Sequence, residues 1–373
     1  MSGQGSILFV GDAREASDLY PEAEKTHHAG KAILPGLVNA HCHLNHSYLK
    51  NRLPLQEGET LFDWIGKVIS EKTETSEEAK TLAAKKELRK CNKNGTVALA
   101  DVVTEPFVLP LLEESGATTL CFHETTGFLP EQAEAIFQER LSHLQELQKR
   151  SAMEHFLSPH SPYSISRELL EKIAGAGLRT SFHLAESREE VEFLQKGHPK
   201  MEQILKSLGK WNPKWKPPGL SPIRYFYDVG LLRENSLAVH MVCVGKEDYP
   251  VLEKSKPHIA LCLRSNAHLR NGLPPVRDYL ELGLNLCLGT DGLGSNHDLS
   301  LLNEMRYLKR CFPDLHEATI LRMGTLGGAK ALGLEEQFGT LEPGKSDKFL
   351  VVECEGSPYG FLAHCSSVSP QYR

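Results

Sequence analysis

Short apolar runs alternate with longer amphipathic stretches along most of the 373-residue chain. The amphipathic stretches, such as "EQAEAIFQERLSHLQELQKR" and "SREEVEFLQK", have the apolar spacing of helices. The apolar runs are rich in β-branched residues and have the length of buried strands. They predict eight strands, near residues 33–43, 95–101, 118–124, 153–160, 178–186, 237–242, 258–265 and 285–291.

Eight strands that alternate with helices predict an α/β fold with a parallel sheet. Eight is the number of strands that closes a (β/α)8 TIM barrel, and we place this barrel at residues 33–335. The alternative is an open, doubly wound sheet, which would carry a glycine-rich turn after its first strand. That position holds "HCHLNH" instead, so the pattern favours the barrel.

Three segments lie outside this alternation. Residues 1–32 contain a predicted short strand, "SILFVGD", and residues 336–373 contain a predicted turn and strand, "FGTLEPGKSDKFLVVE". We expect these two ends to pair into a small composite β subdomain beside the barrel. The third segment, 197–226, is an insertion rich in Trp, Pro and Lys, which either covers a site or packs on the surface.

Composition narrows the class of protein. Hydrophobic residues make up 40% and charged residues 24%, as in ordinary soluble domains. The net charge of −6 and the lack of a long basic tract argue against a nucleic-acid partner. No window reaches the roughly 20 apolar residues that a membrane span needs, and no signal peptide is recognisable. Nine scattered cysteines without a CxxC pair are typical of a reduced protein, so we expect a cytoplasmic location.

The first candidate functional residues are His41 and His43 in "ILPGLVNAHCHL". Residues i and i+2 of a strand face the same side, so both imidazoles share a face while Cys42 points away. An HxH pair alone is either half of a metal site or two packed polar residues.

Other polar residues fall at the ends of further predicted strands. His183 ends the fifth strand in "SFHLAES" with Glu186 three residues later, His240 ends the sixth, and Asp291 ends the eighth in "LGTDG". The carboxyl ends of barrel strands meet on the face that carries active sites. Together with His41 and His43, these placements predict a metal site on that face.

The segments "PGLVNAHCHL", "HLAES", "AVHMV", "RSNAHL" and "LGTDGLGSNHDLSLLNEM" resemble the amidohydrolase superfamily. They are most similar to its single-metal deaminase branch, which includes cytosine, adenosylhomocysteine/methylthioadenosine and aminodeoxyfutalosine deaminases and the triazine hydrolases. The segment "MGTLGGAKALGLEEQFGTLEPGKSDKFLVVE" resembles the closing helix and the return to the β subdomain. The resemblance covers roughly residues 30–353.

This resemblance implies a set of metal ligands. Carried over to this chain, the ligands are His41, His43, His183 and Asp291, which suit Zn²⁺ and would also accept Fe²⁺. The two-metal branch usually bridges its ions with a lysine at the end of the fourth strand. Here that strand ends in "SPHSPYS" with His160, so we expect one divalent metal.

The implied chemistry is attack by water on an electron-poor ring carbon. A bound cation lowers the pKa of water from about 16 to near 7, and Asp291 can accept the proton. His240 corresponds to a residue that hydrogen-bonds this water. Glu186 can protonate the neighbouring ring nitrogen and assist the departure of ammonia. In "AESREE", Glu186 could also serve as a capping partner of the following helix.

Several further residues are candidates for substrate contacts, and packing is the alternative for each. Aromatic residues of the segment 211–227 could also stack on a ring. Cys243 is excluded as a ligand, because three residues beyond His240 along a strand it points away. The candidates are His160 near the substrate, His123 and Glu124 at the mouth, Asn266 in "RSN" at the rim, and Trp64 in "FDWI" as a stacking residue.

The segment "HLNHSYLKNRLPLQEGETLFDWI" bears on the substrate. It lacks the glutamine of guanine deaminases and the extended segment of the adenosylhomocysteine branch. It resembles the compact "HLExS…FxxWL" segment of aminodeoxyfutalosine deaminases, with Asn45 in place of Glu. We therefore expect hydrolytic deamination of a 6-aminopurine nucleoside derivative.

Two alternatives to this function remain. One is hydrolysis with a different leaving group, as in chlorohydrolases, or of a cyclic amide. The other is a metal-stabilised binding barrel without turnover. The expected partner is a small-molecule substrate. A homo-oligomer is possible, because both chain ends are short for the family and a second subunit could complete the β subdomain.

Overall fold

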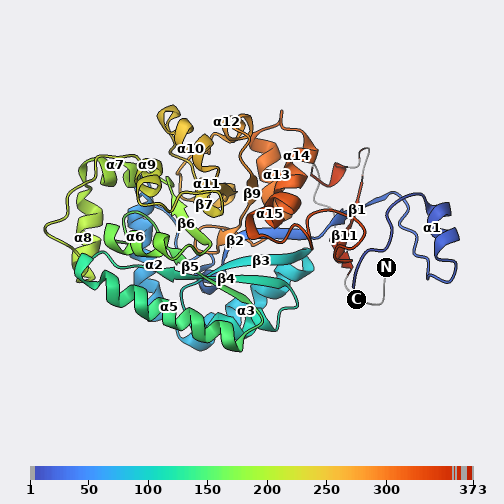
Figure 1. Ribbon diagram of the computed structural model, residues 1–373, viewed down its shortest axis with the longest axis horizontal. Helices are drawn as coiled ribbons and strands as arrows, with labels where there is room; N and C mark the ends of the chain where they lie inside the picture. The colour runs from blue at the N-terminus through green and yellow to red at the C-terminus, as the bar shows by residue number, and fades with distance from the viewer. Residues whose placement is uncertain (1–4, 355–356, 358, 363–367, 372–373) are drawn as a thin grey trace.

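The computed structural model describes residues 5–354, 357, 359–362 and 368–371, and it contains a large barrel-like sheet and a small end sheet (Figure 1). The large sheet is parallel throughout, in the order β10-β2-β3-β4-β5-β6-β7-β8-β9. Its strands are β2 (Leu37–His43), β3 (Thr96–Val103), β4 (Thr118–Thr125), β5 (Glu154–Pro159), β6 (Thr180–Leu184), β7 (Ser236–His240), β8 (His258–Leu261), β9 (Leu286–Leu288) and β10 (Asp291–Gly292).

The sheet closes because the eighth predicted strand divides around Gly289 and Thr290. β9 pairs with β8, whereas β10 pairs with β2. Between them, the Gly289 N–H donates to the Leu261 carbonyl at 3.1 Å and the Thr290 N–H donates to the His41 carbonyl at 2.9 Å. A Cβ on Gly289 would lie only 2.8 Å from that of His41, so glycine permits the close approach. The predicted α/β TIM barrel is confirmed.

The first predicted strand, 33–43, also divides. Its beginning forms β1 (Lys31–Pro35), which pairs antiparallel with β11 (Phe349–Glu353) in the small end sheet. The third strand of that sheet is β12 (Val368–Gln371). The break falls at Gly36, where a Cβ would lie 2.4 Å from Cγ1 of Val97. The small sheet therefore joins segments from both ends of the chain, while the barrel begins at β2.

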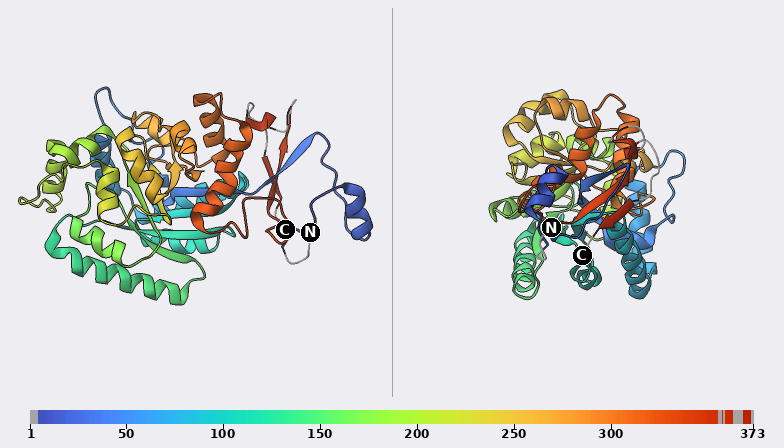
Figure 2. Two further views of the ribbon diagram at one scale, coloured as in Figure 1. Left: turned by 45° about the horizontal axis from the view of Figure 1, so that its top comes forward. Right: turned by 90° about the vertical axis from the view of Figure 1, so that its right-hand side faces the viewer.

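The predicted strand at 6–12 is wrong. Ser6 makes a single bridge to Ser346, and the chain then enters α1 (Ala13–Leu19), where the Asp12 side chain accepts a hydrogen bond from the Arg14 N–H. The apolar run is too exposed for a packed strand, since Leu8 is 39% and Val10 54% exposed. Figure 2 shows α1 apart from the barrel.

The division into a barrel at 33–335 and an end subdomain at 1–32 and 336–373 stays a prediction. Residues 1–4, 355–356, 358, 363–367 and 372–373 of that subdomain lie outside the described residues.

Helices cover the outside of the barrel (Figures 1 and 2). On β2, Val38 and Ala40 belong to an apolar cluster with Ala329 and Ala331 of the closing helix α15 (Gly328–Leu332). The alternate residues of β2, including His41 and His43, therefore face the opposite side. Among the described helices, none combines the length and the apolar character that a membrane crossing requires.

The remaining elements connect the strands. The other α-helices are α2 (Leu61–Glu74), α3 (Glu77–Lys93), α4 (Leu109–Glu113), α5 (Ala133–Arg150), α6 (Arg167–Gly175), α7 (Arg188–Lys196), α8 (Pro199–Ser207), α9 (Pro222–Asp228), α10 (Tyr249–Ser255), α11 (Leu263–His268), α12 (Val276–Glu281), α13 (Leu301–Cys311) and α14 (Glu317–Arg322). Shorter helical turns are η1 (Leu44–Leu49), η2 (Pro106–Val108), η3 (Pro130–Gln132), η4 (Lys246–Asp248), η5 (Met323–Gly327) and η6 (Gly360–Leu362).

Candidate metal centre and active site

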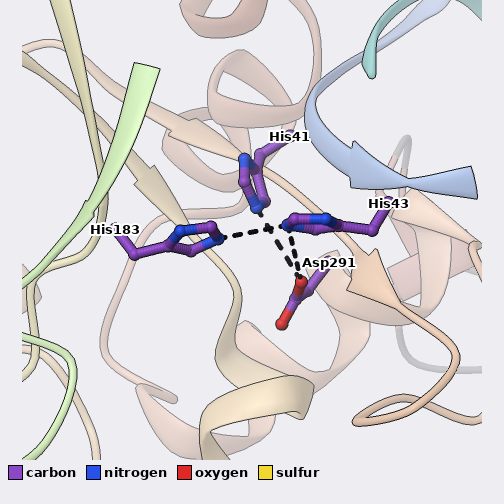
Figure 3. A group of neighbouring side chains, drawn as sticks. All are labelled: His41, His43, His183 and Asp291. Carbon is purple, nitrogen blue, oxygen red and sulfur yellow. Dashed lines mark hydrogen bonds and ion pairs between the residues drawn. The ribbon is translucent and has the colours of Figure 1, made fainter. Parts of the chain in front are cut away.

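Four buried side chains from three strands converge at one rim of the barrel (Figure 3). His41 and His43 come from β2, His183 from β6 and Asp291 from β10, and their ligand atoms all lie within 4.8 Å of one another. Nε2 of His43 is 3.1 Å from Nε2 of His183. Oδ1 of Asp291 is 3.8 Å from Nε2 of His41 and 3.6 Å from Nε2 of His43. We call these four residues the metal cluster.

The donor atoms of the metal cluster fit a divalent cation. Nδ1 of His183 lies 2.9 Å from the His160 carbonyl, which can only accept, so Nε2 of His183 presents a lone pair to the centre. Among the described residues, both ring nitrogens of His41 and Nδ1 of His43 are buried without a hydrogen-bond partner. Such atoms are costly unless something binds them. Three imidazoles and one carboxylate are a typical ligand set for Zn²⁺.

Asp291 is oriented by two serines that the sequence reasoning missed. Its Oδ2 accepts hydrogen bonds from Oγ of Ser265 at 2.6 Å and from Oγ of Ser295 at 2.9 Å. Oδ1 is therefore the oxygen that lies toward the histidines. Ser265 belongs to the quoted "RSN" motif, and Ser295 follows Asp291 by one turn, but only the fold shows that both reach the same oxygen.

The backbone is strained where the strands end at the site. Ala185, His240 and Asp291 have φ values of 51°, 72° and 56°, in the left-handed region that non-glycine residues rarely adopt. Such conformations cluster at functional sites, because the surrounding structure must hold them in place.

Burial controls the charges of the metal cluster. It lowers the pKa of His41 and takes the pKa values of His43 and His183 well below the usual value, so the imidazoles are neutral, as metal ligands must be. Burial alone would raise the pKa of Asp291, but His41, His43 and His240 outweigh it and hold that pKa well below its usual range. Asp291 is therefore an anion.

Glu186 and His240 lie beside the metal cluster. Nε2 of His240 is 3.7 Å from Oε1 of Glu186, and Nδ1 donates to Oδ1 of Asn266 at 2.8 Å. Burial, with the nearby charge of Asp291, raises the pKa of Glu186 well above its usual value, although Asn271 donates a hydrogen bond to it at 3.2 Å. Glu186 is therefore positioned as a protonated carboxylic acid. Asn266, expected at the rim, instead lies behind His240 and orients it.

Glu186 does not cap the next helix. Ser187 is the N-cap of α7, and its Oγ accepts from the Glu190 N–H at 3.3 Å. The Glu190 carboxylate accepts from the N–H groups of Ala185 at 2.7 Å and Glu186 at 2.9 Å. These reciprocal bonds fix the strand end and leave the Glu186 side chain available to the site.

A cavity of about 310 Å³ opens beside the metal cluster. Trp64, Glu124 and His160 line it, as does Glu186. Trp64 donates from Nε1 to the Gly294 carbonyl at 3.3 Å, and Nε2 of His160 is 3.8 Å from Oε1 of Glu124. Three of the predicted substrate-contact residues therefore share one cavity with the candidate catalytic residues.

The prediction that His123 lines the mouth is wrong. His123 and Glu124 are neighbours on β4 and face opposite sides, so only Glu124 reaches the cavity. Nε2 of His123 instead lies 3.0 Å from Nδ1 of His155 on β5, and its ring is 5.6 Å from that of His143 on α5. We call His123, His143 and His155 the outer histidine cluster.

Two of the aromatic residues that were expected to stack on a ring also lie elsewhere. Trp211 and Trp215 of the insertion pack on Phe128 and Phe193 in the outer apolar core. Asn45 is buried, with its amide donating to the Glu105 carbonyl and accepting from the Thr104 N–H, so it fixes a loop rather than lining the cavity.

The insertion 197–226 nevertheless covers the site, because α8 supplies one wall of the cavity. His46, which the sequence reasoning missed, also lines it and stacks on His43 with ring centroids 5.0 Å apart. The α8 residues that line the cavity are Met201, Ile204 and Leu205, followed by Leu208.

Comparison with known proteins shows a family to which this chain belongs and relatives to which it is similar. The model of the amidohydrolase family matches residues 32–371. Aminodeoxyfutalosine deaminase of Deinococcus radiodurans is 28% identical over 348 residues, covering 89% of this chain and 81% of that protein. A 5-methylthioadenosine/S-adenosylhomocysteine deaminase of Pelotomaculum thermopropionicum is 29% identical, covering 93% of this chain and 78% of that protein.

Solved structures agree on the fold. Helicobacter pylori aminofutalosine deaminase, in complex with methylthio-coformycin, has a TM-score of 0.84 at 23% identity and covers 98% of this chain and 91% of its own. An adenosine deaminase from Xanthomonas campestris with bound zinc has a TM-score of 0.78 at 20% identity, covering 98% of this chain and 86% of its own.

Proposed function

Because this chain belongs to the amidohydrolase family, we propose that it is a metal-dependent hydrolase that removes an amino group from a heteroaromatic ring and releases ammonia. The substrate class we propose is a 6-aminopurine nucleoside derivative. The observation that carries the proposal is the buried Glu186 carboxyl, 3.7 Å from His240 and in the same cavity as the metal cluster. The deaminase relatives support the same reaction type.

We propose that the metal cluster holds one divalent ion, Zn²⁺. The donor set of three imidazoles and one carboxylate supports this choice, as does the zinc in the adenosine deaminase structure. When bound, such an ion would lower the pKa of water from about 16 to near 7 and so provide the nucleophile at neutral pH.

The protein's own residues then handle the protons. Asp291, held as an anion, accepts a proton from the attacking water. His240 has its proton on Nδ1, toward Asn266, so Nε2 can accept a hydrogen bond from that water. Glu186 donates its proton to the ring nitrogen next to the attacked carbon. The carbon gains the water oxygen, its bond to the amino nitrogen breaks, and the leaving nitrogen takes up a proton to depart as ammonia.

The cavity walls support a ring-shaped substrate. Trp64 offers an aromatic face, and the α2 and α8 walls are apolar. A hydrolysis that releases chloride instead of ammonia would use the same water and the same metal cluster. The leaving group therefore has to be measured.

A reducing compartment such as the cytoplasm fits the cysteines, because the eight within the described residues are all free thiols. The homo-oligomer stays a prediction.

The test uses zinc-loaded protein and a panel of compounds. The protein is incubated separately with adenosine, 5′-methylthioadenosine, aminodeoxyfutalosine and a chlorinated triazine. Absorbance, ammonia and chloride are then recorded. The proposal expects stoichiometric ammonia from at least one aminopurine. Chloride release without ammonia, or no turnover by folded, metal-loaded protein, would contradict it.

A further inference from the structure

The two oxygens of the Glu186 carboxyl group have different surroundings. Nδ2 of Asn271 donates a hydrogen bond to Oε1 at 3.2 Å. Oε1 is also the oxygen that lies 3.7 Å from Nε2 of His240. Among the described residues, no side chain hydrogen-bonds the other oxygen, Oε2. Asn271 therefore distinguishes the two oxygens of the group that is positioned as the proton donor.

The backbone around Asn271 also serves the second residue that handles protons. The Asn271 N–H donates to the Asn266 carbonyl at 2.9 Å, and the Asn266 N–H donates to the Cys262 carbonyl at 2.9 Å. The side chain of Asn266 accepts the hydrogen bond from His240. The segment 266–271 therefore contacts His240 through its first residue and Glu186 through its last.

Arg270 ties this segment to a distant part of the chain. Its guanidinium group donates to the carbonyls of Gln56 at 2.9 Å and Leu55 at 3.2 Å. Arg270 has a φ of 59°, in the left-handed region that non-glycine residues rarely adopt. Such a backbone conformation persists only where the surrounding contacts hold it. The amide of Asn271 is therefore fixed relative to Glu186 by the fold.

Asn271 does not line the cavity beside the metal cluster. Within the described part of the chain, it lines a separate cavity of about 510 Å³, together with Arg188 and Cys243. Glu186 lines the cavity beside the metal cluster and not this second one. The hydrogen bond between Asn271 and Glu186 therefore joins the walls of two cavities. Asn271 can act on the reaction through Glu186 without touching the substrate.

The hydrogen bond from Asn271 becomes stronger as Glu186 gives up its proton. When the O–H bond of Glu186 breaks and an N–H bond forms on the ring, negative charge spreads over both carboxylate oxygens. A hydrogen bond to a charged acceptor is roughly twice as strong as one to a neutral acceptor. Asn271 therefore stabilises the transition state more than the ground state, which is the condition for a faster reaction.

We propose that Asn271 is a positioning residue, which holds the acidic proton of Glu186 on Oε2 and stabilises the carboxylate that remains after proton transfer. An N–H donor favours the carbonyl oxygen of a carboxylic acid, so Oε1 is the carbonyl oxygen and Oε2 the hydroxyl oxygen. This inference rests on the proposed deaminase function and deepens it, because it identifies the oxygen that delivers the proton.

The first experiment is a double-mutant cycle in zinc-loaded protein, with whichever of adenosine, 5′-methylthioadenosine and aminodeoxyfutalosine releases ammonia fastest. N271A should lower kcat by roughly 10- to 100-fold, the usual effect of losing a hydrogen bond to a charged group, and leave KM nearly unchanged. In the E186Q background, the same change should lower kcat by less than about twofold, because glutamine has no proton to give. Equal losses in both backgrounds would overturn the inference.

Two further variants control the cycle. N271D keeps the size of the side chain, but its carboxylate would accept the proton of Glu186 instead of donating, so kcat should fall at least as far as in N271A. N303A is the matched control, since the Asn303 amide also donates to a carboxylate, Oδ2 of Asp298 at 3.0 Å, but lies on α13 outside the site. N303A should keep the kcat of the unaltered chain. An unchanged kcat in N271D would contradict the inference.

Infrared spectroscopy separates this inference from the proposed function, because it needs no turnover. The carbonyl stretch of protonated Glu186 is the carboxylic acid band that E186Q removes. Without the donor from Asn271, this band should shift to higher wavenumber in N271A. If none of the compounds is deaminated, the proposed function fails, and the band still tests the hydrogen bond. A band at the same position in N271A and the unaltered chain would overturn the inference.

Discussion

Two groups of histidines lie on opposite faces of the same barrel wall, and they differ in what surrounds them. In the metal cluster, three imidazoles converge on a carboxylate, and several ring nitrogens have no partner among the described residues. In the outer histidine cluster, Nε2 of His123 lies 3.0 Å from Nδ1 of His155, only Nε2 of His155 is buried without a partner among the described residues, and the third ring, His143, is exposed. Histidine content alone therefore does not indicate a metal site.

The hydrogen bonds that orient the donor atoms also distinguish the metal cluster from the outer histidine cluster. Asp291 is held by two serines and His183 by a backbone carbonyl. These hydrogen bonds orient their donor atoms toward the centre of the metal cluster. No acidic side chain of the described residues joins the outer histidine cluster to form a comparable set of donors. The metal cluster therefore differs from the outer histidine cluster because its donor atoms converge on one point.

The largest expected effect is the loss of a metal ligand. H183A should release the ion and reduce ammonia formation by at least about 10³-fold, since water then keeps its ordinary pKa. Metal content by elemental analysis and ammonia release by a coupled assay measure the two effects. H155A, in the outer histidine cluster, is the control and should retain its metal. Full metal content in H183A would contradict the assignment.

The next effect concerns proton transfer. E186Q keeps the shape of the side chain but removes its acidic proton, so activity should fall by roughly 10²- to 10⁴-fold. Because Glu186 is not a ligand, metal content should stay unchanged. The rate and the bound metal are measured on the same sample. An E186Q protein that retains full activity would show that Glu186 is not the proton donor.

A smaller effect is expected from the serines that orient Asp291. S265A removes the 2.6 Å hydrogen bond to Oδ2 but leaves the bond from Ser295. Zinc affinity should fall by about 10-fold, in the range usual for such supporting contacts. Competition with a chromogenic chelator measures the affinity. S300A, at the N-cap of α13 and outside the site, is the control for a general loss of stability.

The last effect concerns stability in acid at the outer histidine cluster. Burial, with the nearby His155 and His143, lowers the pKa of His123 to about 3 from its ordinary value of 6.5. Below pH 6.5, the His123 side chain therefore binds a proton in the unfolded chain, whereas in the folded chain it stays neutral down to about pH 3. His123 contributes stability above that pH, and this contribution decreases as the pH falls toward 3, by up to about 1.4 kcal/mol per pH unit.

H123Q removes this titration, so its free energy of unfolding should depend less steeply on pH between 6 and 4 than that of the unaltered chain. Urea unfolding of both zinc-loaded proteins across this range measures the difference between the slopes. Because the metal cluster is the same in both, its own titration cancels. Equal slopes would mean that His123 titrates normally in the folded protein.

The strand-end residues of the metal cluster were predictable from the sequence. The two-residue period of a strand places His41 and His43 on one face, and the barrel rule brings His183 and Asp291 to the same rim. Whether Glu124 or its neighbour faces inward depends on the register of β4, and a shift of one residue reverses the faces. That is why His123 was misplaced.

Other features depend on contacts between distant segments. The divisions at Gly36 and Gly289 follow from how closely the backbone approaches its neighbours, which an apolar run does not reveal. The serines that orient Asp291 come together only when distant loops and helices pack. The chain near residues 6–12 has strand-like composition, but among the described residues it pairs only at its beginning, where Ser6 bridges Ser346 and the Ile7 N–H donates to the Lys345 carbonyl.

The most direct test of the account is a crystal of zinc-loaded protein, with anomalous scattering recorded above and below the zinc absorption edge. We expect one strong peak per chain, among Nε2 of His183, the imidazoles of His41 and His43, and Oδ1 of Asp291. No peak should appear at the outer histidine cluster. A peak at the outer cluster, or none within the metal cluster of fully folded protein, would contradict the central claim.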